Sequence, residues 1–179
     1  FSTFGLCKGS VSLSKLLWYI PLAALISSNL WFGLRWNLSV HETFLYIGSM
    51  ICVGFVEEVI FRGLLFNAMR KDGLKSAVIV SSLTFGIGHI VNLFNGSGAQ
   101  LVSNLCQVGY AIAIGFLFVI MFLKTGSLVP CIVTHSAVNS LSVFANEGNI
   151  TVAQEIFSAI AIAVISLAYA VYLLKKLPE

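Results

Sequence analysis

Residues 43–66 read TFLYIGSMICVGFVEEVIFRGLLF, an apolar run whose only charged side chains are Glu57, Glu58 and Arg62. A helix that crosses the hydrocarbon core of a bilayer needs about 20 mostly apolar residues, so this stretch is long enough to span a membrane. Ionisable side chains inside a span are costly, and they usually face the interior of a helix bundle at a functional site. The stretch therefore predicts both the class of fold and the position of the site.

The composition of the whole chain agrees with a membrane protein. Of its 179 residues, 58% are hydrophobic and 9% are charged, whereas soluble domains carry about 25% charged residues. The net charge is +3 and there is no basic stripe, so we expect no nucleic-acid partner. The four cysteines form no C-x-x-C pair, which argues against a disulfide framework or a structural zinc site.

Apolar stretches extend over most of the chain and predict an all-α, polytopic transmembrane helix bundle of about six spans. The spans are Leu16–Leu34, Thr43–Phe66, Lys75–Val91, Leu101–Leu123, Ser127–Phe144 and Val152–Leu174. If the N-terminus is cytoplasmic, every basic loop residue except Arg35 falls on the cytoplasmic side, as the positive-inside rule requires. We therefore expect one integral membrane domain over residues 1–179, in the lipid bilayer of a cell membrane, with both termini cytoplasmic.

Strongly polar side chains remain at depth on three of these spans. They are Glu57, Glu58 and Arg62 on the second span, His89 on the third, and His135 with Asn139 on the fifth. Glu58 and Arg62 are four residues apart and share a helix face, as do His135 and Asn139. At about 1.5 Å rise per residue, the polar groups of all three spans lie about 12–21 Å from the cytoplasmic ends. This common depth predicts one intramembrane polar cavity.

Carboxylates and imidazoles shielded from bulk water suit general acid–base chemistry. A glutamate can take a proton from a water that attacks a carbonyl, while an imidazole and an amide NH₂ donate hydrogen bonds to the developing oxyanion. Glu57, His89 and His135 are the candidate ligands if a divalent metal such as zinc takes part. The helical zinc-protease motif H-E-x-x-H is absent, so the usual helical zinc site is not expected. We expect no permanent zinc, and whether a divalent metal takes part stays open, with no other cofactor indicated.

The polar residues fall into three motifs: E-E-x-x-x-R at residues 57–62, F-x-x-x-H at Phe85–His89, and H-x-x-x-N at His135–Asn139. With these motifs the chain resembles the CAAX protease and bacteriocin-processing (CPBP or Abi) family, which includes the Ras-converting endoprotease. The motif-bearing core covers about residues 43–144. The resemblance implies a helical membrane bundle with a cavity open to the cytoplasm, and an intramembrane glutamate-dependent endopeptidase that hydrolyses a peptide bond.

The resemblance also assigns catalytic roles to the motif residues. It implies that Glu57 and His89 activate the water, and that His135 and Asn139 form the oxyanion hole. The substrate would be a hydrophobic or membrane-associated peptide. The shortness of the chain suggests a bacterial member that acts in peptide maturation, bacteriocin immunity or membrane proteolysis.

Glu58 is also a candidate catalytic residue, and the resemblance implies that it and Arg62 support or orient the other groups. Phe85 is expected to have an orienting role. The choice of Glu57 rather than Glu58 as the base rests on the resemblance alone. Two other classes of function stay open. One is a proton-coupled transporter, since Glu and His within spans also mark ion paths, although no inverted repeat is visible. The other is a non-catalytic membrane immunity or scaffold protein.

Overall fold

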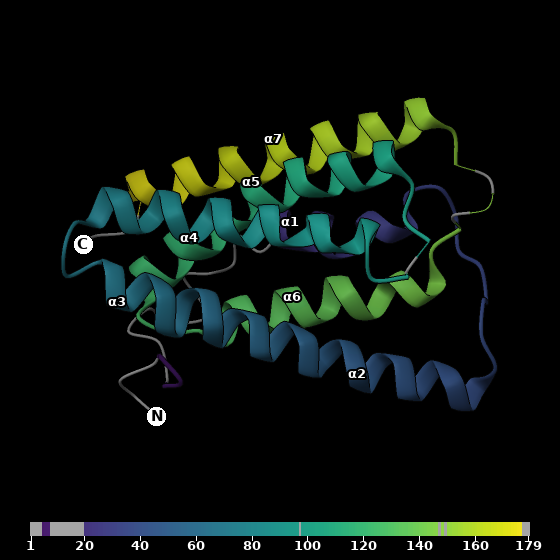
Figure 1. Cartoon of the computed structure of the whole chain (residues 1–179), viewed down its shortest axis with the longest axis horizontal. Helices are drawn as coiled ribbons and strands as arrows, with labels where there is room; N and C mark the ends of the chain where they lie inside the picture. The colour runs from purple at the N-terminus through teal and green to yellow at the C-terminus, as the bar shows by residue number, and fades with distance from the viewer. Residues whose placement is uncertain (1–4, 8–19, 97, 147, 149, 177–179) are drawn as a thin grey trace.

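The computed structural model of the protein describes residues 5–7, 20–96, 98–146, 148 and 150–176. Within these ranges the regular structure is helical, apart from an isolated bridge between Leu34 and Ala145 (Figure 1). The α-helices are α1 (Ile20–Ile26), α2 (Val40–Glu58), α3 (Asn67–Met69), α4 (Leu74–Gly88), α5 (Leu101–Thr125), α6 (Val129–Leu141) and α7 (Val152–Lys176). The segments η3 (Ser27–Leu30), η5 (His89–Leu93) and η6 (Ser142–Phe144) are 3₁₀-helical, and η4 (Val59–Phe66) is π-helical. The predicted all-α bundle is confirmed.

Four helical stretches are long and apolar enough to cross a membrane, and they match the second, third, fourth and sixth predicted spans. They are Val40–Met69, Leu74–Leu93, Leu101–Thr125 and Val152–Lys176. The first and fifth predicted spans correspond to shorter apolar helices, Ile20–Leu30 and Val129–Phe144. Residues 16–19 of the first predicted span lie outside the described residues. The protein is thus a multi-pass membrane protein in which two of the apolar helices are too short by length alone to cross the hydrocarbon core.

Local sequence signals set the ends of α2, α5 and α6. Ser39 begins α2 with a capping box, in which its side chain accepts from the Glu42 backbone N–H and the Glu42 carboxylate accepts from the Ser39 backbone N–H. Gly126 ends α5 in the left-handed conformation, with φ of 67°, which glycine adopts without steric cost. Pro130 follows in the first turn of α6, where its missing N–H is not needed.

The bundle is organised around α5. This helix lies between α4 and α7, while α2 packs along α6 (Figure 1). A continuous run of α5, Leu117–Phe122, is buried and supplies much of the apolar core. Most large apolar side chains of α2 are exposed, including Phe44 and Leu45, as expected for a helix whose outer face contacts lipid.

Small residues bring the motif-bearing helices close together. A Cβ atom at Gly54 on α2 would lie 2.6 Å from the hydroxyl oxygen and 2.9 Å from the backbone nitrogen of Ser136 on α6. A Cβ atom at Gly86 on α4 would lie 2.6 Å from the backbone nitrogen of Ile112 on α5. Glycine permits such close approach between membrane helices, and these two contacts hold α2 against α6 and α4 against α5.

Candidate active site

The cluster of motif residues contains a fully buried ion pair between Glu58 and Arg62. The Arg62 Nη1 atom lies 2.9 Å from Glu58 Oε1, and both side chains are 0% exposed. Arg62 Nη2 donates to the carbonyl of Gly115 on α5 at 3.2 Å. The guanidinium carbon lies 4.1 Å from the ring centroid of Phe85 and 5.4 Å from that of Phe118, distances at which an aromatic face attracts a cation. One cation therefore connects the helix of the first motif to α4 and α5.

His135 on α6 contacts both adjacent glutamates, each through a different ring nitrogen. Its Nδ1 lies 2.8 Å from Glu58 Oε1, and its Nε2 lies 3.6 Å from Glu57 Oε2. Because Glu58 is the ion-pair partner of Arg62, and an ionised carboxylate only accepts hydrogen bonds, Nδ1 carries the proton in this contact. The ring is thereby oriented with Nε2 toward Glu57.

The two glutamates differ in their access to solvent or substrate. Glu58 is 0% exposed and accepts from both Arg62 and His135. The Glu57 side chain is 32% exposed, and its contact with His135 Nε2, at 3.6 Å, is too long for a good hydrogen bond. Neighbouring residues in a helix point about 100° apart, which allows one carboxylate to face the core and the other to face outward.

The helix widens at this point into the π-helical segment η4, which contains Arg62. The Ser81 hydroxyl of α4 donates to the carbonyl of Phe61 within this segment at 2.8 Å. Single π-helical turns inside α-helices are rare and often mark functional sites. The sequence predicted a regular helix here. The expected Glu58–Arg62 contact still forms.

His89 joins the cluster through Phe85, by a ring contact and by a hydrogen bond to the Phe85 backbone. It lies at the end of α4, half-buried, with its ring centroid 5.3 Å from that of Phe85 in an edge-on arrangement. The ring centroid of Phe85 also lies 5.5 Å from that of His135, again edge-on. Phe85 thus contacts both imidazoles and the Arg62 guanidinium.

Asn139 lies one turn after His135 on α6 and is half-buried. Its side chain makes no hydrogen bond to another residue in the described ranges, so its amide is available to a ligand. Its backbone carbonyl accepts from the Ser142 hydroxyl at 2.7 Å.

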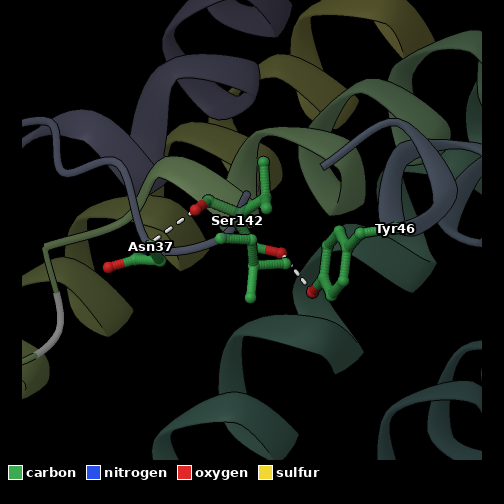
Figure 2. Close-up of a pocket in the computed structure, with 5 residues that line it drawn as sticks. Asn37, Tyr46 and Ser142 are labelled. Atoms are coloured by element: carbon green, nitrogen blue, oxygen red, sulfur yellow. Dashed lines mark hydrogen bonds between the residues drawn. The ribbon is translucent and has the colours of Figure 1, made fainter. Parts of the chain in front are cut away.

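A pocket of about 250 Å³ lies near the start of α2 (Figure 2). It is lined by Asn37, Leu38, Tyr46, Ser142 and Val143. The Tyr46 and Ser142 hydroxyl oxygens are 2.8 Å apart, and the Asn37 amide donates to the Val143 carbonyl at 2.9 Å. None of the motif residues lines this pocket, and the polar cavity expected around Glu57 stays a prediction.

The arrangement does not fit a bound metal. Across the described ranges, no three His, Cys, Asp or Glu side chains are placed so that they could hold a metal ion. Glu57, His89 and His135, the ligand set considered from the sequence, are therefore not gathered into a coordination site, and the mechanism below uses protein groups alone.

A comparison with family models adds independent information on the chain. The model for type II CAAX prenyl endopeptidase, Rce1-like, matches residues 39–141. The matched range is more than half of the chain and contains all three motifs. The chain matches no curated protein and no solved structure.

Proposed function

Because the chain belongs to the Rce1-like family of type II CAAX prenyl endopeptidases, we propose that it is an intramembrane endopeptidase in which Glu57 activates the attacking water. The observation that carries this proposal is the difference between the two adjacent carboxylates. Glu58 is fully buried and bonded to Arg62 and His135, while Glu57 is partly exposed beside His135 Nε2.

Glu57 is the better general base of the two. A base must reach the proton it abstracts, directly or through one water, and must have a free acceptor position. Glu58 is 0% exposed, so water does not reach its Oε2, which has no hydrogen-bond partner among the described residues. Its Oε1 accepts from Arg62 Nη1 and His135 Nδ1, so Glu58 orients His135 instead. Glu57 takes a proton from water as the water oxygen attacks the carbonyl carbon. Glu57 then returns this proton to the amide nitrogen when the carbon–nitrogen bond breaks.

His135 and Asn139 are the proposed oxyanion donors. When the His135 ring carries both protons, Nδ1–H stays with Glu58 and Nε2–H is available to the oxyanion. The Asn139 NH₂ lies one helical turn away on the same helix. His89, held against Phe85, is proposed to orient the water together with Glu57.

The proposed substrate is a hydrophobic or membrane-associated peptide, because the site lies among apolar helices. We place the protein in a bacterial cell membrane, acting in peptide maturation, bacteriocin immunity or membrane proteolysis. Basic residues support a cytoplasmic position for the end of the bundle where α4 begins and α7 ends. The exposed basic residues at this end are Arg70, Lys71, Lys75, Lys175 and Lys176.

The test compares purified wild type, Glu57→Gln and Asp72→Asn in detergent with a library of hydrophobic and lipidated peptides. Asp72 is the matched control, because it is an exposed carboxylate in the turn before α4, away from the cluster. Products are identified by mass spectrometry. We expect wild type and Asp72→Asn to cleave the same peptides and Glu57→Gln to cleave none.

Cleavage by Glu57→Gln at the wild-type rate would exclude Glu57 as the base. If all three proteins are folded and none cleaves, the non-catalytic immunity or scaffold function is favoured instead.

A further inference from the structure

The backbone at His89 is held by a buried amide from the next helix. The α-helix α4 ends at Gly88, and the chain continues from His89 as the 3₁₀ segment η5. Carbonyls at the end of a helix lose their intrahelical partners and need others. The Asn104 Nδ2 atom on α5 donates to the His89 carbonyl at 2.9 Å. Asn104 therefore caps the end of α4 at the residue whose imidazole belongs to the second motif.

A second amide ties η5 to the same turn of α5. Gln107 Oε1 accepts from Asn92 Nδ2 at 3.0 Å and lies 3.5 Å from Asn104 Nδ2. Asn92 is part of η5, three residues after His89. The segment that begins at His89 is thus attached to α5 at two points along the chain.

The backbone just before His89 is equally constrained. At Gly86, α4 approaches α5 so closely that no side chain fits between Gly86 and the backbone of Ile112. With Gly86 on one side and Asn104 on the other, little freedom is left for the His89 backbone, and Phe85 supports the ring. Small displacements at this point would move the imidazole relative to Glu57 and His135.

Asn104 is also an unusual residue for its position. It is 1% exposed, and its Oδ1 has no hydrogen-bond partner among the described residues. A buried polar group in a membrane span costs free energy unless it is bonded. The Asn104 Nδ2 atom is the bonded end of this side chain, and the nearer of its two acceptors is the His89 carbonyl, at 2.9 Å against 3.5 Å for Gln107 Oε1.

We propose that Asn104 is a positioning residue for His89, acting through the His89 carbonyl to hold the imidazole against Phe85. The inference rests on the proposed function, in which His89 orients the attacking water. No existing motif includes Asn104, since it lies between the second and third motifs in the sequence.

Two substitutions remove the donor in different ways. Asn104→Leu replaces the amide with an apolar side chain of similar size, and Asn104→Asp keeps the shape but replaces the NH₂ donor with an acceptor. Ser166→Ala is the matched control, because Ser166 on α7 is fully buried and its hydroxyl makes no hydrogen bond within the described part of the chain. We expect kcat to fall about 10- to 100-fold in both Asn104 variants at unchanged KM, and Ser166→Ala to match wild type.

A double-mutant cycle separates positioning from general structural support. If Asn104 acts through His89, then Asn104→Leu has little further effect in the His89→Ala background. If Asn104→Leu lowers kcat by the same factor in wild type and in His89→Ala, the positioning role is overturned. The positioning role is also overturned if both Asn104 variants have normal kinetics while His89→Ala is impaired. A normal rate for His89→Ala would instead overturn the role of His89 in the proposed function, and the inference with it.

A second measurement does not depend on activity. Hydrogen–deuterium exchange of wild type, Asn104→Asp and Ser166→Ala in nanodiscs reports how firmly the end of α4 is held. We expect faster exchange at residues 89–95 in Asn104→Asp alone, with the rest of α4 unchanged. Unchanged exchange at these residues would overturn the inference even if no substrate has been found.

Discussion

His135 Nδ1 lies 2.8 Å from Glu58 Oε1, a contact between residues that are 77 positions apart in the chain. It joins α6 to the end of α2 and decides which imidazole nitrogen faces the partly exposed Glu57. The same contact distinguishes two carboxylates that are neighbours in sequence. One carboxylate holds the ring through Nδ1, and the other is the general base of the proposed mechanism.

The two nitrogens of His135 are expected to have separable roles. Asparagine places its side-chain nitrogen near the position of Nδ1, and glutamine places its nitrogen near that of Nε2. We expect His135→Asn to keep wild-type stability and lose cleavage. We expect His135→Gln to retain more cleavage but to lose about 1–3 kcal/mol of stability, because Glu58 loses a buried partner. Peptide cleavage and unfolding in detergent measure the two effects. If His135→Asn is active and His135→Gln is inactive, the roles assigned to Nδ1 and Nε2 are reversed.

Neutralising Glu58 is expected to lower the stability of the protein, whereas neutralising Glu57 is expected to abolish cleavage with little change in stability. Glu58→Gln leaves the Arg62 guanidinium buried without its counter-charge, and loss of one partner of a buried pair costs about 3–5 kcal/mol. Glu57→Gln changes a side chain that is 32% exposed, so its stability stays close to that of wild type while its cleavage is lost. Unfolding curves of both variants check the difference, which a similar loss of stability in the two would contradict.

The contact between α2 and α6 is expected to tolerate no methyl group at Gly54. Gly54→Ala places a carbon 2.9 Å from the Ser136 backbone nitrogen, and such overpacking typically costs about 1–3 kcal/mol. Cleavage should fall as well, because His135 follows α6 away from Glu57.

Gly48 provides the matched control on the same helix, since a Cβ atom there meets nothing within 4 Å. Gly48→Ala should be neutral or stabilising by up to about 1 kcal/mol, because alanine favours helix. Thermal unfolding compares the stability of Gly54→Ala and Gly48→Ala. A stability change of the same sign in both variants would contradict the close contact of α2 with α6 at Gly54.

Tyr46 is expected to contribute to stability but not to catalysis. Its hydroxyl bonds to that of Ser142 at the pocket near the start of α2, which no motif residue lines. Tyr46→Phe removes this bond at a cost of about 1 kcal/mol and should leave kcat unchanged. A large fall in kcat would place the pocket on the path of the substrate.

Helical spacing and motif order predicted the parts of the cluster that depend on regular geometry. The i, i+4 relation of Glu58 and Arg62 correctly predicted their contact, and the common depth of the polar groups correctly brought His135 to the same site. The π-helical segment was not predicted, because it depends on packing against α4, where Ser81 bonds to Phe61.

Other features carry no signal that one sequence could reveal. Asn104 does not ionise, and its partner is a backbone carbonyl, so neither charge nor spacing connects it to His89. The fifth predicted span, Ser127–Phe144, agrees with α6 and η6, Val129–Phe144, to within two residues. Hydropathy alone does not show whether so short an apolar helix crosses the membrane.

The pairing of Glu58 with Arg62 also bears on how the protein enters the membrane during synthesis. Both residues belong to the same stretch of helix, so they neutralise each other as soon as that helix forms. The other partners of the pair are translated later. They are Phe85, Gly115, Phe118 and His135. The nascent span therefore carries its own counter-ion until the rest of the bundle arrives, and a variant that lacks one of the two charges must insert with the other uncompensated.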